Sequence, residues 1–453
     1  MYRCSFSKTD KINQYEELIK VFLQPGEYEI LTEEDAEESS CHRYVFEGDK
    51  DEIKRRLYKN LQEFTGRSPK WGIITGIRPV KLAAELYKST GNIESVKRIL
   101  KDTYFLHEEK AELTAEILSY QRSLMGFPEA GSISLYVGIP FCPTRCLYCS
   151  FTSNQVSEEE IKRYLEALEK EIKYAGNAVK QQKSKIESLY IGGGTPTTLN
   201  EHMLERLLVN IHNAFAVDDI EEFTVEAGRP DTITPEKLRL LKDFGVNRIS
   251  INPQSMNEKT LQLIGRAHTA EDIERAFEDA HKSGIEVINA DLIAGLPGEE
   301  FADFENSLAR VLDLGAANIT LHTLAVKRAS RLKDMDENFN YRNQELREEM
   351  LSHALNKLEA KGYAPYYLYR QKHTSGNTEN IGFCSDDKIS RYNVRIMEEA
   401  QSILALGAGG ISKVYFPEEN RLERVANVSN YEIYIERIAE MIQRKKENFF
   451  VSA

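Results

Sequence analysis

Cys142-Pro-Thr-Arg-Cys146-Leu-Tyr-Cys149 follows directly after residues 135–141, an apolar run that predicts a β-strand. Three cysteines with the spacing C-x3-C-x2-C at the end of a strand can direct three thiolates toward one site. Thiolates are the ligands of iron–sulfur clusters, and three of them leave one iron of a [4Fe–4S] cubane without a protein ligand. A small molecule can bind at that open iron. The stretch therefore predicts a cluster held by Cys142, Cys146 and Cys149.

Zinc and disulfide bonds are the alternative explanations for these cysteines. A structural zinc site normally closes with four ligands, and the neighbouring sequence offers no fourth cysteine or histidine. The chain has six cysteines in 453 residues and no secretory signal, which does not predict a disulfide framework. Cys4, Cys41 and Cys384 are scattered, and we expect plain thiols. An aromatic residue, Tyr148, directly precedes the last cysteine, and the motif resembles that of radical S-adenosylmethionine (SAM) enzymes.

Length and composition indicate an ordinary globular protein. A chain of 453 residues predicts about two to four domains, and 41% apolar with 29% charged residues leaves ample material for a core. There is no run of 18 apolar residues and no basic N-terminal signal segment, so neither a membrane span nor export is expected. The net charge of −13 argues against a broad nucleic-acid surface. Because a thiolate-ligated cluster favours a reducing interior, we expect a cytoplasmic location.

Changes of pattern along the chain predict three domains. Residues 1–127 combine helical apolar spacing with a short strand pattern, which indicates an α+β domain. Residues 128–330 alternate strands with amphipathic helices, which predicts an α/β fold, a partial (β/α)6 barrel of the TIM type. Residues 331–453 begin with a polar stretch and contain an aromatic strand-like run at 363–369; they predict a mainly helical or mixed C-terminal domain. The expected barrel strands are 135–141, 188–191, 222–226, 248–252, 286–293 and 318–324.

Polar motifs follow the predicted strands, where barrel-like βα folds gather their chemistry. Gly192-Gly-Gly-Thr-Pro196 follows the second strand, and its glycines let backbone amides approach a ligand closely. It lacks the Gly-Lys-Ser/Thr of a phosphate loop; beside the cysteines it predicts a loop for the amino and carboxylate groups of SAM. Four more polar residues could contact SAM: an acid that accepts from ribose hydroxyls, an amide, an arginine whose guanidinium can pair with a carboxylate, and a second acid. These residues are Glu226, Gln254, Arg266 and Asp291. For Asp291, a structural ion pair with Arg248 or Arg266 is the alternative.

Together these motifs resemble the oxygen-independent coproporphyrinogen III oxidase family of radical SAM proteins. The resemblance is strong over residues 134–330, and Trp71-Gly-Ile-Ile-Thr-Gly-Ile-Arg-Pro79 resembles the branch called HemZ. It is carried by Tyr136-Val-x-Ile-Pro-Phe-Cys142, the cysteine motif, Gly192-Gly-Gly-Thr-Pro196, Val225-Glu226-Ala227, Asn247-Arg-Ile-Ser250, Gln254-Ser255, Gly265-Arg266-Ala-His268 and Asp291-Leu-Ile-x-Gly-Leu-Pro297.

The resemblance implies a mechanism, partners and site residues. SAM would be cleaved reductively to a 5′-deoxyadenosyl radical, which removes hydrogen from a propionate side chain; that side chain then loses CO2 and becomes vinyl. The implied partners are a small-molecule tetrapyrrole and a low-potential electron donor such as flavodoxin or ferredoxin. Catalysis would involve Tyr136, Glu226 and Arg266. The cofactors would be contacted by Tyr136, Tyr148, Gly193, Gly194, Thr195, Glu226, Gln254, Arg266 and Asp291.

The chain also departs from the family pattern. Phe151 stands where the characterised oxidases have a fourth cysteine, and haem-carrier relatives share this phenylalanine. Arg391-Tyr392-Asn393 replaces the family's Arg-His-Asn. A haem-binding carrier and a radical SAM enzyme for another tetrapyrrole are therefore the competing functions. His322, Lys327 and Arg328 follow the sixth strand, where cations could pair with propionates; a solvated basic turn beside a core histidine is the alternative.

Overall fold

The computed structural model describes residues 1–7, 12–37, 40–45, 50–149, 154–218, 220–324, 344–370 and 379–450. These residues form two compact units. The first contains Met1–Tyr120 with the described parts of 340–344 and 368–380, and the second contains the other described residues. The division into three domains at residues 127 and 330 stays a prediction.

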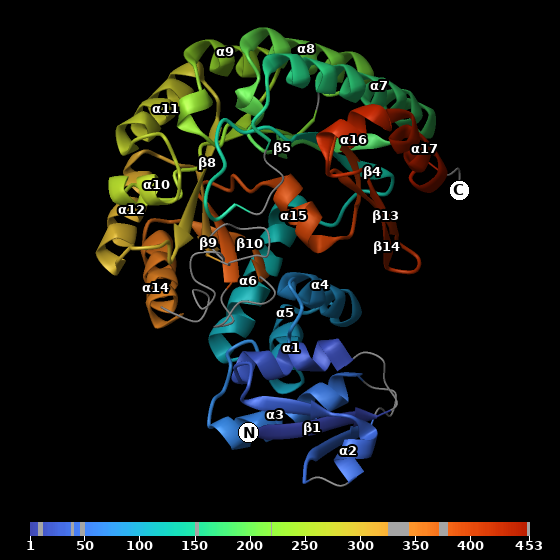
Figure 1. Ribbon diagram of the computed structural model, residues 1–453, viewed down its shortest axis with the longest axis vertical. Helices are drawn as coiled ribbons and strands as arrows, with labels where there is room; N and C mark the ends of the chain where they lie inside the picture. The colour runs from blue at the N-terminus through green and yellow to red at the C-terminus, as the bar shows by residue number, and fades with distance from the viewer. Residues whose placement is uncertain are drawn as a thin grey trace. The chain divides into compact units, whose positions relative to one another are not determined.

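The first unit has the α+β character that its sequence predicts. Strand β1 (Tyr2–Ser7) pairs in parallel with β2 (Tyr28–Leu31) and with β3 (His42–Val45). Helices α1 (Ile12–Phe22) and α3 (Lys50–Thr65) pack together and bury the apolar residues that their helical spacing places on one face (Figure 1). The other helices are α2 (Glu33–Glu37), α4 (Pro79–Thr90), α5 (Ile93–Asp102) and α6 (Glu108–Met125).

The second unit is built on parallel strands in the order β9-β8-β7-β6-β5-β4. Each neighbouring pair is parallel, and helices α7, α8, α9 and α11 follow the outer face of this curved sheet (Figure 1). The predicted partial (β/α)6 barrel is confirmed. The strands are β4 (Ser132–Ile139), β5 (Lys185–Gly193), β6 (Glu222–Glu226), β7 (Arg248–Ser250), β8 (Val287–Ala294) and β9 (Asn318–Thr323). The helices are α7 (Glu158–Gln182), α8 (Glu201–Ala214), α9 (Pro235–Asp243), α10 (Glu258–Leu263), α11 (Ala270–Ser283) and α12 (Phe301–Asp313).

Local capping signals set the starts of the barrel helices. The side chain of Ser157 accepts a hydrogen bond from the amide of Glu160 in a capping box that opens α7. Thr234 caps α9, with proline at the first helical position, and Thr269 forms a second capping box at α11. Gly284, in the left-handed conformation, ends α11. These helix ends are set by local sequence, because a cap depends on residues only a few positions apart.

Residues after 344 add strands as well as helices. Beyond β9 the sheet continues with β11 (Glu379–Cys384) and β10 (Ala364–Arg370). Beyond β4 it continues with β12 (Ser402–Leu406), β13 (Ile411–Phe416) and β14 (Arg421–Ala426). The strand-like run expected at 363–369 corresponds to β10, whereas the other four strands were not expected. Of the five, β11 covers the edge of β9 and β12 covers the edge of β4. The helices are α14 (Gln344–Ala360), α15 (Arg391–Glu398), α16 (Tyr431–Glu436) and α17 (Ile438–Asn448).

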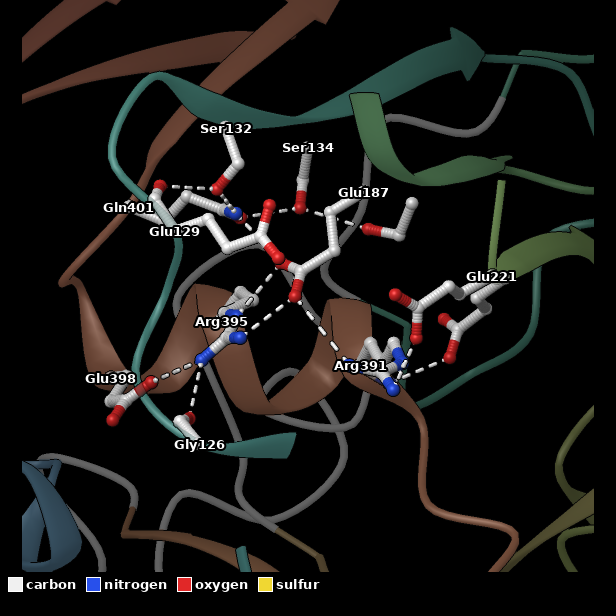
Figure 2. Close-up of polar contacts among 12 residues, drawn as sticks. Gly126, Glu129, Ser132, Ser134, Glu187, Glu221, Arg391, Arg395, Glu398 and Gln401 are labelled. Carbon is white, nitrogen blue, oxygen red and sulfur yellow. Dashed lines mark hydrogen bonds and ion pairs between the residues drawn. The ribbon is translucent and has the colours of Figure 1, made fainter. Parts of the chain in front are cut away.

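A buried polar network at the amino ends of β4 and β5 holds α15 against the barrel (Figure 2). Arg395 of α15 donates from Nε and Nη2 to the two carboxylate oxygens of Glu187, at 2.8 and 2.7 Å. Gln401 donates to Glu187 at 2.7 Å and to Ser132 at 2.8 Å. A two-pronged guanidinium–carboxylate pair fixes orientation as well as distance. The network therefore fixes α15 against the start of β5.

Candidate functional site

The cysteine loop leaves the carboxyl end of β4. The amide of Cys142 donates to the carbonyl of Asn154 at 3.1 Å, so the loop returns beside its own start. The amide of Cys149 donates to the carbonyl of Cys146 at 3.2 Å, which makes a tight turn between the last two cysteines. These bonds keep the three cysteines on one short loop at the end of the barrel strand.

Hydrogen-bond donors lie against two of the sulfurs. The Sγ of Cys142 lies 3.5 Å from the hydroxyl of Thr195, and the Sγ of Cys146 accepts from Nη1 of Arg229 at 3.9 Å. Burial raises the pKa of the Cys142 thiol to about 11, although Thr195 lowers it. This thiol is protonated at neutral pH in the absence of metal, and binding iron must displace its proton.

The motif cysteines do not gather around one point in the described structure. Within the part of the chain that the structure describes, no three cysteine, histidine, aspartate or glutamate side chains surround one point as they would a metal ion. A cubane makes a different demand, because each cysteine binds its own iron. Phe151, Lys327 and Arg328 lie outside the described residues.

The glycine turn runs alongside the strand that carries Cys142. The amide of Gly194 donates to the carbonyl of Ile139 at 2.8 Å, and the amide of Thr195 donates to that of Phe141 at 2.7 Å. Gly193 has a φ of +116°, a backbone conformation that residues with a side chain rarely adopt. A Cβ added to Gly194 would lie 2.4 Å from the carbonyl oxygen of Phe141. Glycine is therefore required by the close approach of these two backbone segments.

Glu226 lies at the end of β6 and faces the glycine turn. Its Oε1 accepts from the hydroxyl of Tyr190 at 2.6 Å, and its Oε2 accepts from the amide of Gly193 at 3.1 Å. Burial raises the pKa of Glu226 to about 7, with a further contribution from Asp291; the two donors oppose the shift. Each oxygen keeps acceptor capacity for another donor, because a carboxylate oxygen has two lone pairs.

Gln254, which follows β7, lies beside Asp291 of β8. The backbone amide of Gln254 donates to the backbone carbonyl of Asp291 at 2.9 Å, and Gln254 has a φ of +68°. The Asp291 carboxylate accepts from Asn289 at 2.8 Å and lies 3.4 Å from Nε2 of His322. Although burial opposes it, this imidazole holds the pKa of Asp291 below its ordinary value. The partner of Asp291 in the described structure is therefore His322, not Arg248 or Arg266.

Arg266 links the cysteine loop to the rest of the site. Its Nη2 donates to the hydroxyl of Tyr148 at 3.1 Å, and its Nη1 donates to the carbonyl of Asn252 at 2.5 Å. Three buried polar atoms here have no hydrogen-bond partner among the described residues: Nε of Arg266, Oε1 of Gln254 and Oδ1 of Asn252. Buried polar atoms normally have partners, so this edge of the barrel has free capacity for a polar ligand.

Comparison with known proteins agrees with this geometry. Residues 136–311 match the model of the radical SAM superfamily. The chain is 38% identical over 397 residues to the oxygen-independent coproporphyrinogen-III oxidase-like protein HemZ of Bacillus subtilis strain 168, which covers 86% of this chain and 79% of the relative. This chain belongs to the HemZ-like branch of the radical SAM family.

Two further comparisons describe the neighbours of this branch. The chain is 32% identical over 310 residues to the heme chaperone HemW of B. subtilis, covering 68% of this chain and 76% of the relative. The solved structure of the coproporphyrinogen III oxidase HemN from Escherichia coli superposes with a TM-score of 0.55 over 72% of this chain and 73% of that one. At 24% identity, this likeness shows a shared fold. No described helix has the length and apolarity needed to cross a membrane.

Radical SAM proteins use a [4Fe–4S] cluster and SAM, and the residues here fit both. Three thiols on one loop with donors at two sulfurs suit a cluster, whose thiolates are stabilised by hydrogen bonds. The side-chain-free glycine turn, the acceptor Glu226 and the unpartnered atoms at Arg266 and Gln254 suit a zwitterion that carries a ribose.

A stack of three tyrosines joins β4, β5 and α15, and the sequence did not predict that these rings would meet. Tyr136 stacks on Tyr190 at 6.2 Å between ring centroids, and Tyr190 stacks on Tyr392 of α15 at 4.5 Å. The two-residue alternation along β5 places Tyr190 on the same face as the strand-end glycines, and that signal could have identified it. No local signal could place Tyr392 there, because its position depends on how α15 packs.

Proposed function

We propose that this chain is a radical SAM oxidase that converts coproporphyrinogen III to protoporphyrinogen IX without oxygen. The similarity to the HemZ oxidase-like protein supports it most, because that similarity covers 86% of the chain and so extends well beyond the barrel. We also propose a cytoplasmic location, no nucleic-acid partner, and the three-domain division 1–127, 128–330 and 331–453.

The proposal gives each group at the barrel edge a role. Cys142, Cys146 and Cys149 would hold the cluster. When bound, the cluster and SAM supply a 5′-deoxyadenosyl radical able to remove hydrogen from a propionate side chain. Glu226 would accept from the ribose hydroxyls, using lone pairs that Tyr190 and Gly193 leave free. Arg266 would bind the SAM carboxylate through its unpartnered Nε.

The remaining residues would orient the ligands and the substrate. Gly193, Gly194 and Thr195 would bring backbone atoms against SAM, and Tyr136 and Tyr148 would provide its aromatic walls. Gln254 and Asp291 would offer further acceptors. On the tetrapyrrole side, His322 lies next to Asp291 and is a candidate for contact with a propionate. Lys327 and Arg328 are proposed as further propionate partners, and a flavodoxin or ferredoxin as the electron donor.

A haem carrier is the second candidate function. The observation that favours it is the similarity to the heme chaperone HemW, at 32% identity over 76% of that relative. Phe151 points the same way, because the oxidases have cysteine at that position. A carrier would keep the cluster and bind haem, but would not decarboxylate coproporphyrinogen.

One experiment separates the two candidates. Anaerobically reconstituted protein is incubated with coproporphyrinogen III, SAM and a low-potential reductant, and the products are resolved by mass. If the protein is the oxidase, it produces the divinyl porphyrinogen and forms 5′-deoxyadenosine only when coproporphyrinogen III is present. A parallel sample with haem tests for a carrier and for turnover of another tetrapyrrole. The Cys146→Ala variant should form neither product, and Cys384→Ala should resemble wild type. Cleavage of SAM that ignores coproporphyrinogen, without a vinyl product, would refute the oxidase.

A further inference from the structure

A buried arginine outside the predicted SAM site contacts the cysteine loop. Arg229 lies just after β6, next to the short turn Pro230–Thr232, and its side chain is only 3% exposed. Its Nη1 donates to Sγ of Cys146 at 3.9 Å and to the hydroxyl of Thr144 at 2.5 Å. One edge of the guanidinium is therefore directed at a proposed cluster ligand and at the loop that carries it.

Another edge of the same guanidinium forms a two-pronged pair with an aspartate. Nε and Nη2 of Arg229 donate to the two carboxylate oxygens of Asp231, both at 3.0 Å. The buried His268 lies beyond it, with Nδ1 at 3.6 Å from Asp231. Against the effect of burial, His268 and Arg229 keep the pKa of Asp231 well below its ordinary value. Asp231 is thus a charged anchor on the far side of Arg229, and the fork is fixed in one orientation.

We propose that Arg229 is a positioning residue that sets the reduction potential of the cluster through the thiolate of Cys146, and that Asp231 moderates its effect. This inference rests on the proposed ligation of the cluster by the three motif cysteines. Hydrogen bonds to cluster sulfurs are among the features that set the potentials of iron–sulfur proteins.

The arrangement predicts shifts of opposite sign for the two charges. Reduction places one electron, supplied by a one-electron reductant, on the cluster and makes it more negative. The nearby cation of Arg229 stabilises the reduced form, so removing it should lower the potential. The carboxylate of Asp231 lies behind the guanidinium and offsets part of its field. Removing that charge while Arg229 remains should therefore raise the potential.

The test is a reductive titration of the reconstituted full-length protein, followed by the EPR signal of the reduced cluster. Arg229→Met, Asp231→Asn and wild type are compared after iron and sulfide are measured in each. Arg206→Met is the matched control: Arg206 also forms a guanidinium–carboxylate pair, with Glu169 at 2.8 Å, but it lies on α8. We expect Arg229→Met to reduce the ratio of reduced to oxidised cluster at a fixed potential about tenfold, which corresponds to about 59 mV for one electron. Asp231→Asn should shift the potential upward and Arg206→Met should leave it unchanged.

Each outcome decides the inference. A lower potential in Arg229→Met with a higher one in Asp231→Asn supports it. Shifts of the same sign, or no shift in either variant, would show that Arg229 only braces the loop. If Arg229→Met holds no cluster, Asp231→Asn decides alone, and an unchanged or lower potential overturns the inference. Failure of the proposed ligation looks different: wild type would then hold no cluster, or Cys146→Ala would retain it.

Discussion

Replacing Glu226 by glutamine tests whether the site is built for a ligand at the expense of stability. Glutamine has the same shape but no charge, and it can keep both present contacts. Its Oε1 can accept from the amide of Gly193, and its amide group can donate to the hydroxyl of Tyr190, which rotates to accept. The substitution therefore removes mainly the buried charge.

The size of the effect follows from the raised pKa of Glu226. Burial moves this pKa from an ordinary 4.5 to about 7. One pKa unit corresponds to about 1.4 kcal/mol, so holding the charged form in the fold costs up to about 3 kcal/mol. An acid with a raised pKa contributes stability that is fully present below pH 4.5 and is lost as the pH rises through 7. The cost is therefore complete near pH 8.

The assay is denaturant unfolding of the cluster-free protein, for wild type and Glu226→Gln, at several pH values between 5 and 8.5. We expect a gain for Glu226→Gln of about 1 kcal/mol at pH 5 that grows to as much as about 3 kcal/mol at pH 8.5. The variant should also bind SAM about ten to one hundred times more weakly when the cluster is present, the usual scale for a lost hydrogen bond to a charged group. Glu205→Gln, on the exposed face of α8, is the control.

A difference between the two proteins that does not change with pH would refute this reasoning, because only titration of Glu226 produces the slope. If the pH dependence appears as expected but SAM affinity is unchanged, Glu226 carries a buried charge but does not bind SAM.

Three further outcomes are expected. Changing any motif cysteine to alanine should abolish the brown cluster of about four irons, measured by iron content, whereas Cys384→Ala should retain it. Gly194→Ala should weaken SAM binding at least tenfold in a binding titration, because its Cβ would clash with backbone 2.4 Å away; Gly228→Ala, whose Cβ meets nothing closer than 3.5 Å, should be tolerated. Lys445→Met should lower the unfolding free energy by about 3–5 kcal/mol, because it leaves Glu171, fully buried and paired with Lys445 at 2.6 Å, without its cation. Recovery of stability on adding Glu171→Gln would confirm the cause, and a loss below about 1 kcal/mol would contradict it.

Several parts of this protein follow from local sequence alone. The strand predicted over 222–226 coincides with β6, and Ser157, Thr234 and Thr269 cap the helices that directly follow them in the sequence. The cysteine spacing and the glycine turn were found in the same way. Strand alternation, caps and short motifs act over a few residues, so a single segment contains the whole signal.

The barrel edge was also foreseeable in outline. Parallel strands joined by helices bring their carboxyl ends to one edge, so residues that follow different strands could be predicted to share a site. The structure does bring Glu226 to the glycine turn and Gln254 to Asp291. It differs in the partner of Asp291, which is His322. The register between β8 and β9 pairs Asp291 with Thr320, and His322 lies two residues further along β9 on the same face.

Only the tertiary structure decided the contacts between distant segments. The strand β12 lies beside β4, although more than 260 residues separate them, and α15 inserts Tyr392 against Tyr190. Arg229 reaches Cys146 across 83 positions of sequence. No periodicity or motif encodes such pairs, because they depend on which edge of the sheet remains to be covered and on which faces pack together. The sequence thus determined the chemistry that this protein carries, and the packing of distant segments decided which side chains surround it.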